Sequence, residues 1–400
     1  MSQPANAPPL AGVRVVDLSR VLAGPYATMT LADLGADVVK IEHPAGGDET
    51  RAWGPPFAGG ESAYFLSVNR GKRSVAVDLK DPEGRDLALE LCARADVVIE
   101  NFRPGGAARL GLDYEAVRAR RPDVVYCTIS GFGSREPSDR AGYDFTVQAE
   151  SGLMAITGEP DGEPVKVGVA IVDVLTGLNA ATAILAALHR RDVTGEGDRV
   201  EVSLLDTAFA ALVNVGANAL LTGEEPRRYG NAHPSIVPYQ PFRAADGWIA
   251  VAAANDGLYS KLCLAIGRPD LAVDERYATN ELRVLNREPL IAELQAVFAG
   301  RAAEEWEGPL LASGVPAGSI RGVGEALRAG QARTRLVDHP TAGAVELVGP
   351  PFELESALLG ASAPPPLLGQ HTAEVLAELG VDDERLGSLE ERGVIARSAA

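Results

Sequence analysis

Short runs of β-branched residues alternate with amphipathic segments along the first third of the chain. The runs predict strands at residues 13–19, 36–42, 73–79, 96–102 and 123–133. Segments 25–35 and 81–95 between them predict helices, the first beginning at Pro25 and ending at Gly35. Repeated strand–helix–strand units pair their strands in parallel and place helices on the faces of the sheet. The pattern therefore predicts an α/β domain of the Rossmann-like class.

Beyond Asp173 the strand–helix alternation gives way to other patterns. Residues 178–191 form an almost wholly apolar helix pattern that ends in arginines, as suits a buried helix. Residues 222–242 are rich in glycine, proline and polar residues and indicate a linker. Residues 243–325 combine a short strand pattern with charged amphipathic helices, which is typical of a smaller α+β domain.

Charge and cysteine content limit the function classes. Lysine and arginine number 37 and aspartate and glutamate 55, a net charge of −18, which argues against broad binding to nucleic acid or an anionic membrane. Any anionic ligand must then meet a local basic site. The cysteines Cys92, Cys127 and Cys263 show no disulfide or zinc spacing, and the first two lie in runs that predict burial. The first dozen residues lack a signal-peptide pattern, so we expect a cytoplasmic protein.

Several common chemistries find no support. The five histidines show no metal-ligand spacing, so no metal site is predicted. The first strand is followed by SRVLAGP rather than GxGxxG, which weakens the case for a dehydrogenase. Ser130 lies in ISGFG, which is not a GxSxG nucleophile motif.

Two stretches could carry chemistry. In NFRPGGAARLG (101–111) a strand ends and Arg103 and Arg109 follow, at a place where parallel sheets hold ligands and arginine suits phosphate. The alternative is a solvated basic turn. Asp173 precedes the long apolar helix among Val172, Val174 and Leu175, where a carboxylate is costly to bury. The alternative there is an ordinary helix-capping aspartate.

Six blocks of the sequence are similar to the type III (CaiB/BaiF-like) CoA-transferases, which include formyl-CoA transferase. They are DLSRVLAGPYATMTLADLGADVVKIEHPAGGDETR, NRGKRSVAVDLKDPEGRDLALELCARADVVIENFRPG, AGYDFTVQAESGLM, VDVLTGLNAATAILAALHRRDVTGEGDRVEVSLLD, GNAHPSIVPYQPF and LGQHTAEVLAELG. The resemblance implies a large Rossmann-like domain from both termini, a small domain and an interlocked homodimer. With it we expect residues 1–205 in the large domain, 206–242 as a linker, 243–325 as the small domain, and 326–400 as a second linker with the C-terminal part of the large domain.

The resemblance also assigns roles to residues. It implies that Asp173 is the nucleophile, forming first an aspartyl mixed anhydride and then an aspartyl-CoA thioester. Coenzyme A is then a substrate, with a carboxylic acid as acceptor and no tightly bound cofactor or metal. The CoA contacts carried over are His43, Val77, Asp78, Leu79, Lys80, Asn101, Phe102, Arg103, Arg109, Leu110, Arg140 and Tyr143. The substrate pocket is expected to include Leu22 and the segment Gly230, Asn231 and Ala232.

The sequence departs from the family pattern at two places, and two alternative functions compete with CoA transfer. Relatives devoted to oxalate carry glutamine where this chain has Leu22, and a run of glycines where it has HPSIVPYQ; we therefore expect a different acyl group, such as a small dicarboxylic acid like succinate. An α-methylacyl-CoA racemase would need a histidine base at the position of Tyr143, and tyrosine is a poor base at neutral pH. A non-catalytic acyl-CoA-binding protein would be expected to lose the acid, yet Asp173 is present.

Overall fold

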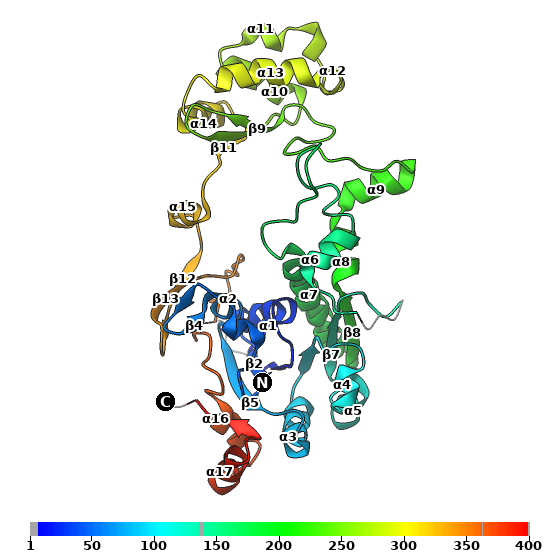
Figure 1. The fold of residues 1–400 in the computed structure, drawn as a ribbon, viewed down its shortest axis with the longest axis vertical. Coiled ribbons are helices and arrows are strands. Elements are labelled where there is room, and N and C mark those ends of the chain that lie inside the picture. Colours follow the sequence, from blue (N-terminus) through cyan, green and yellow to red (C-terminus); the bar gives the residue numbers. More distant parts are fainter. Residues whose placement is uncertain (1–6, 136–139, 362, 399–400) are drawn as a thin grey trace. The chain divides into compact units, whose positions relative to one another are not determined.

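The protein is described by a computed structural model covering residues 7–135, 140–361 and 363–398. The chain forms two compact units (Figure 1). Unit 1 contains Met1–Leu153, Val167–Ala217 and Arg333–Ala400, and unit 2 contains Met154–Lys166 and Asn218–Ala332. The placement of 154–166 in unit 2 differs from the expected boundaries, in which 1–205 stay together.

A parallel sheet forms the centre of unit 1. Its strand order is β14-β5-β2-β1-β6-β7-β8, and every neighbouring pair is parallel except β14 with β5. The strands are β1 (Arg14–Asp17), β2 (Asp37–Glu42), β5 (Lys72–Val77), β6 (Val97–Glu100), β7 (Val125–Ser130), β8 (Asp198–Ser203) and β14 (Ile395–Ala396). The predicted α/β class with a parallel main sheet is confirmed. The strand order runs outward in both directions from β1 and β6, as in doubly wound folds.

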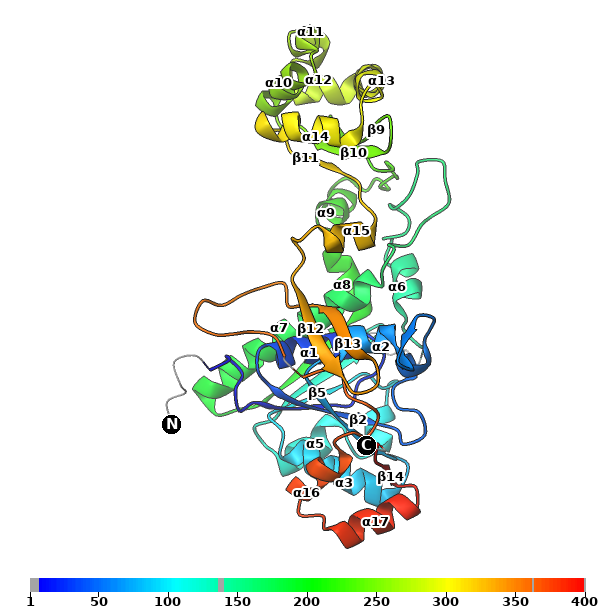
Figure 2. The ribbon, with the colours of Figure 1, turned by 90° about the vertical axis from the view of Figure 1, so that its left-hand side faces the viewer.

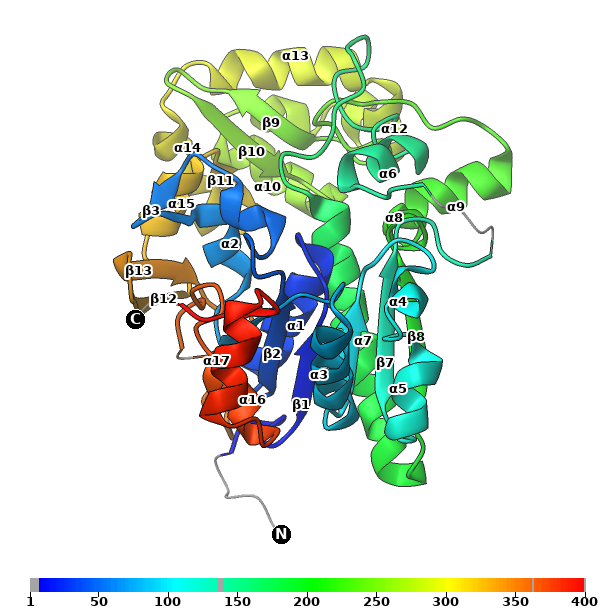
Figure 3. The same cartoon turned by 60° about the horizontal axis from the view of Figure 1, so that its bottom comes forward.

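Alternating side chains direct the strands into two cores. In β1, Val15 belongs to the core under α1 (Ala23–Asp33), α7 (Ile171–Thr194) and α8 (Leu204–Ala211), whereas Val16 belongs to the core on the opposite face. That second core is closed by the helices α3 (Pro82–Ala93), α5 (Tyr114–Arg120), α16 (Thr372–Glu378) and α17 (Asp383–Glu391). Figure 2 shows the two helical layers on either side of β2 and β5, and Figure 3 shows α3, α16 and α17 in front of the strands. Because successive strand residues face opposite ways, a strand buried on both faces is apolar along most of its length.

Helix α7 is the longest helix described. Its length and composition would permit a membrane span, but it is a core helix here, with Ala180, Ala181 and Ile184 buried. It ends at Gly195, whose φ of 75° is the left-handed conformation that glycine adopts most easily. The remaining elements of unit 1 are η1 (Glu49–Ala52), β3 (Phe57–Ala58), β4 (Glu61–Ser62), α2 (Ala63–Val68), α4 (Gly106–Arg109), α6 (Asp144–Glu150), β12 (Thr334–His339) and β13 (Gly343–Val348).

Unit 2 is a three-stranded antiparallel sheet packed against helices. The strands are β9 (Tyr239–Arg243), β10 (Trp248–Ala252) and β11 (Ala317–Ser319), in the order β11-β10-β9. The helical elements are α10 (Asp256–Ala265), α11 (Pro269–Ala272), η2 (Glu275–Tyr277), α12 (Asn280–Leu285), α13 (Arg287–Phe298), α14 (Ala303–Ala312) and α15 (Val323–Arg328). Phe242, Ile249, Leu262, Leu294 and Trp306 lie in its buried core.

The segment expected to be a linker contains regular structure at both ends. Helix α8 and then α9 (Val213–Thr222) occupy its first part, because the apolar and alanine-rich sequence there favours helix. Strand β9 begins at Tyr239, where alternation allows pairing with β10. Cys92 and Cys127 are buried as predicted, and burial raises the pKa of the Cys92 thiol to about 12.

Candidate active site

The ends of β1 and β6 are joined by one asparagine side chain. The Asn101 Oδ1 atom accepts a hydrogen bond from the Arg20 amide at 2.9 Å, and its Nδ2 donates to the Arg20 carbonyl at 2.8 Å. Strand order reverses between these two strands, and ligands of doubly wound sheets bind in the crevice at such a point. The buried Glu100 carboxylate accepts the Phe102 amide at 2.7 Å and so orders the turn after β6.

A cavity of about 330 Å³ opens at this point. It gathers seven of the residues predicted from the sequence, namely Leu22, Asn101, Phe102, Arg103, Arg140, Tyr143 and Asp173. Arg20 and Ala23, from the loop after β1 and the start of α1, also line it. Residues far apart in the sequence thus share one cavity because parallel strands end at the same edge of the sheet.

Asp173 is not the capping residue of α7. It is the third residue of that helix, and the Asp144 Oδ1 atom accepts the amides of Val172 at 2.8 Å and Asp173 at 3.3 Å. Gln148 Nε2 donates to the other Asp144 oxygen at 2.6 Å. Asp173 is thus not the N-cap itself, but it lies in the first turn of α7, so the alternative of an ordinary aspartate near the cap stays open.

The Asp173 carboxylate is held in an unfavourable electrostatic setting. Burial, and secondarily the negative charge of Asp144, raise its pKa to about 7. No ion pair to Asp173 occurs within the described part of the chain. The negative charges of Asp173 and Asp144, together with burial as the larger cause, raise the pKa of Tyr64 to about 12. A carboxylate with a raised pKa is more basic and a stronger nucleophile than an ordinary aspartate.

Two glycines let the loops of the cavity touch. A Cβ atom on Gly131 would lie 2.5 Å from the Gly142 Cα atom, and one on Gly142 would lie 2.3 Å from the Gly131 Cα atom. Both residues line the cavity with Asp173. Side chains at either position would separate the end of β7 from the segment that leads into α6.

A second cavity, of about 240 Å³, lies at the ends of β2, β5 and β6. It brings together the predicted CoA contacts His43, Val77, Asp78, Leu79, Lys80, Phe102 and Leu110. His43 Nε2 lies 3.7 Å from Asp78 Oδ1. Arg20 and Phe102 border both cavities, so the two are adjacent. Arg109 is exposed on α4 and lines neither of them.

The predicted Gly230–Ala232 segment belongs to unit 2. The Gly230 amide donates to the Gly158 carbonyl at 3.1 Å, and the Ala232 amide donates to the Tyr229 carbonyl at 3.0 Å. Its role in the substrate pocket stays a prediction.

Sequence reasoning missed two residues of the site. Asp144 stands in the quoted block AGYDFTVQAESGLM, but nothing local indicates that it caps a helix beginning 27 positions later. Tyr64 packs against the same small apolar cluster as Leu22 and Val174, and reads in the sequence as one of several apolar residues of a short helix. No group of three His, Cys, Asp or Glu side chains suited to a metal occurs among the residues that the structure describes.

The chain is similar to known proteins along nearly its whole length. The family model for CoA-transferase family III matches residues 10–372. Human succinyl-CoA:glutarate CoA-transferase is 45% identical over 98% of this chain and 90% of its own length. Succinate–glutarate CoA-transferase from Agrobacterium fabrum is 46% identical over 94% of this chain and 97% of its own length. The crystal structure of a CaiB/BaiF family protein from Brucella suis, 44% identical, covers 94% of this chain and 100% of that chain with a TM-score of 0.84.

Proposed function

The chain belongs to CoA-transferase family III, and on that premise we propose that Asp173 is the nucleophile that moves CoA between small dicarboxylic acids. That the protein is a CoA-transferase follows from the family; the residue and the acids are the proposal. The observation that carries the choice of residue is the Asp173 carboxylate itself, which lines the cavity at the switch point and has a pKa raised to about 7.

The proposed reaction consumes no water, and no proton is gained or lost overall. The Asp173 carboxylate attacks the thioester carbonyl of the donor, the C–S bond breaks, and CoA leaves as a thiolate. The thiolate then attacks the aspartyl carbonyl of the mixed anhydride, the C–O bond breaks, and the donor acid is released. The acceptor carboxylate attacks the resulting aspartyl-CoA thioester and releases the thiolate again. Attack of the thiolate on the acceptor acyl carbon gives the new acyl-CoA and returns Asp173.

The environment of Asp173 suits each of these steps. Its apolar neighbours Leu22 and Val174 restrict water, which would hydrolyse the anhydride. Among the described residues no side chain caps α1, whose first residue Ala23 lines the cavity, so the positive end of that helix faces developing negative charge. The same feature attracts an acceptor carboxylate.

Dicarboxylic acids are supported by two observations. Relatives from human, mouse and Agrobacterium fabrum, at 45–46% identity, are named for succinate and glutarate. The cavity with Asp173 is lined by Arg20, Arg103 and Arg140, which can meet a second carboxylate. We expect glutarate to be a better acceptor than valerate, the monocarboxylic acid of equal length, by on the order of 100-fold in kcat/KM.

We place the CoA moiety in the second cavity because of the residues that line it. His43 and Lys80 line it together with the apolar residues Leu79, Phe102 and Leu110, a mixture suited to phosphate and adenine. Because this cavity shares Arg20 and Phe102 with the first, a single extended ligand can reach Asp173 from it. Arg109, which lines neither cavity, is the weakest of the predicted contacts.

A homodimer is part of the proposal, and α9 supports it. No residue of this helix is buried, and Leu220 and Leu221 are 89% and 85% exposed. Large exposed apolar patches mark interaction surfaces. Light scattering is expected to give twice the mass of one chain, and Leu220→Glu to reduce it, whereas Leu264→Glu on α10 leaves it unchanged. A monomeric wild-type enzyme with full activity would contradict the dimer.

Intact-protein mass spectrometry tests the nucleophile. After incubation with succinyl-CoA and quenching with hydroxylamine, we expect an adduct that maps to Asp173 and is absent in Asp173→Asn. Asp192→Asn, at an exposed position of the same helix, is the matched control and should keep the adduct. An adduct that persists in Asp173→Asn would refute the assignment. Deuterium exchange at the α-carbon of a branched acyl-CoA, without any adduct, would favour a racemase instead.

A further inference from the structure

The loop that follows β1 contains a strained residue. Val21 has a φ of 71°, in the left-handed region that β-branched residues rarely adopt. Such a conformation persists only where the surroundings impose it, and it is frequent at functional sites. Val21, Leu22 and Ala23 all line the cavity that contains Asp173.

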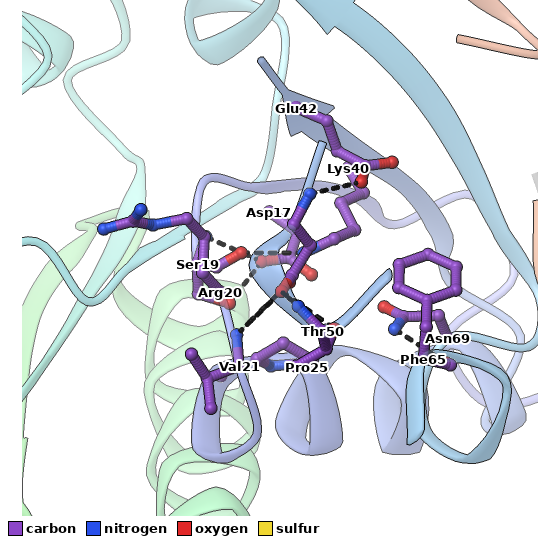
Figure 4. A network of polar contacts seen from close by, with 12 residues as sticks. Asp17, Ser19, Arg20, Val21, Pro25, Lys40, Glu42, Thr50, Phe65 and Asn69 are labelled. Carbon is purple, nitrogen blue, oxygen red and sulfur yellow. Dashed lines mark hydrogen bonds and ion pairs between the residues drawn. The ribbon is translucent and has the colours of Figure 1, made fainter. Parts of the chain in front are cut away.

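A buried ion pair imposes this conformation. The Val21 amide donates to the two oxygens of Asp48 at 3.3 and 3.2 Å, and Lys40 Nζ lies 2.9 Å from Asp48 Oδ2. Lys40 Nζ also donates to the Ser19 carbonyl at 2.8 Å. Both charged side chains are fully inaccessible to solvent. The pair therefore holds the loop at two backbone points, one on each side of Arg20 (Figure 4).

Further hydrogen bonds fix the pair itself. The Thr50 amide and hydroxyl donate to Asp48 Oδ1 at 3.0 and 2.8 Å. A second buried carboxylate, that of Asp17, accepts a hydrogen bond from the Ser19 amide at 2.9 Å and lies 3.1 Å from Lys72 Nζ. The loop is thus tied to buried charges along its length, while the Arg20 side chain points away from them toward solvent (Figure 4).

The geometry points to Lys40 and Asp48 as a positioning pair for CoA transfer, which holds Val21 in its left-handed conformation and thereby fixes the Val21–Ala23 wall of the cavity that contains Asp173. This inference rests on the proposed role of Asp173. Neither Lys40 nor Asp48 lines that cavity. Both belong to the lining of the second cavity, but their charged side chains are inaccessible to solvent, so the pair acts through the backbone of the loop. Displacement of a reacting group by about 1 Å can lower a rate on the order of 100-fold.

The test separates positioning from simple stabilisation. Asp48→Asn leaves Lys40 without its counter-ion and leaves one acceptor oxygen for the Val21 amide. We expect kcat per folded molecule to fall on the order of 100-fold while KM for the acyl-CoA stays nearly constant. Glycine adopts a positive φ without strain, so Val21→Gly in the Asp48→Asn background should recover most of the lost kcat. Val21→Gly alone should retain most of the wild-type kcat.

Two further variants control for the possibility that Asp48→Asn fails to fold. Asp33→Asn disrupts another buried ion pair of unit 1, between Asp33 and Arg70, and should lower stability without lowering kcat of the folded fraction. Thr50→Val removes one hydrogen bond to Asp48 with little change of shape, and should give a smaller kcat loss that Val21→Gly also reverses. If Asp48→Asn does not fold, Thr50→Val with and without Val21→Gly carries the test.

The outcomes are distinct. A normal kcat in folded Asp48→Asn, with a lower melting temperature alone, would make the pair purely structural. A double variant no better than Asp48→Asn would show that Val21 is not the link. An unaltered adduct in Asp173→Asn would refute the proposed function itself, whichever result the pair gives.

Discussion

Replacing Asp173 by asparagine should stabilise the protein at neutral and alkaline pH, and this prediction follows directly from the cost of the buried charge. Burial and the charge of Asp144 raise the Asp173 pKa from 3.8 to about 7. Between these two pH values the folded state binds more protons at this site than the unfolded state, so ionisation costs stability as pH rises. The cost is absent below about pH 4, grows through the interval, and is constant above about pH 7.

The magnitude follows from the same shift. A change of about three pKa units corresponds to about 4 kcal/mol, and solvent that reaches the partly exposed carboxylate reduces it to between about 2 and 4 kcal/mol. The asparagine side chain keeps the shape of the aspartate without the charge. The variant should therefore match the wild type near pH 4 and exceed it by this amount at pH 8.

Urea unfolding at half-unit steps from pH 4 to 8.5 measures the difference. The wild type and Asp173→Asn share every other titrating group, so the difference isolates this carboxylate. Asp192→Asn, on the exposed part of the same helix, should show no such pH dependence. A variant that is less stable than the wild type at pH 8, or a difference that does not change with pH, would refute the idea that the protein holds a destabilised carboxylate here.

Three further predictions concern the same cavity. Asp144→Asn keeps an acceptor for the α7 amides but removes the negative charge, so the Asp173 pKa should fall and the acid limb of the kcat/KM profile should move to lower pH by about one unit. Gly131→Ala should destabilise the protein by about 1–3 kcal/mol in urea unfolding and lower kcat, because its Cβ would meet the Gly142 Cα at 2.5 Å. Arg20→Met should raise KM for glutarate in steady-state assays while leaving KM for valerate nearly unchanged.

Each of these three has a result that would contradict it. An acid limb that stays in place in Asp144→Asn would mean that the two carboxylates do not interact. Gly168→Ala, where an added Cβ meets nothing within 4 Å, is the control for Gly131→Ala, and equal effects of the two would remove the close-approach argument. An Arg20→Met enzyme with an increased KM for the acyl-CoA alone would place that arginine on the CoA phosphates.

The strand and helix pattern of unit 1 could be predicted because it depends on residues that are close together in the sequence. The strand expected at 73–79 is observed at Lys72–Val77, and the helix expected at 81–95 at Pro82–Ala93. Apolar runs flanked by a capping aspartate and proline define such elements without reference to the rest of the chain. The local pattern did not predict that residues 101–103 and Asp173 share one cavity, which is a result of the fold.

The parts that could not be predicted depend on contacts distant in sequence. Asp144 caps α7 across 28 positions, and Val21 owes its conformation to Asp48, 27 positions away. Neither partner has a local pattern that sets it apart from a solvated acid. The assignment of residues 154–166 to unit 2 could not be predicted either, because it depends on packing between distant segments and not on local secondary-structure propensity.

The contrast among the acids of unit 1 supports the proposal that Asp173 is the reactive one. Asp17 and Asp48 are more deeply buried than Asp173, yet each lies within 3.1 Å of a lysine nitrogen, and these charges and their hydrogen bonds hold the pKa of both below the ordinary value. Such carboxylates are stable anions and poor nucleophiles. Asp173 has no ion-pair partner among the described residues, and burial and the charge of Asp144 raise its pKa, so its ionised form is high in free energy and gains from bonding to an acyl carbon. Asp17 and Asp48 fix the wall of the cavity, because lysines stabilise their charges. Asp173 can react within the cavity, because its surroundings destabilise its charge.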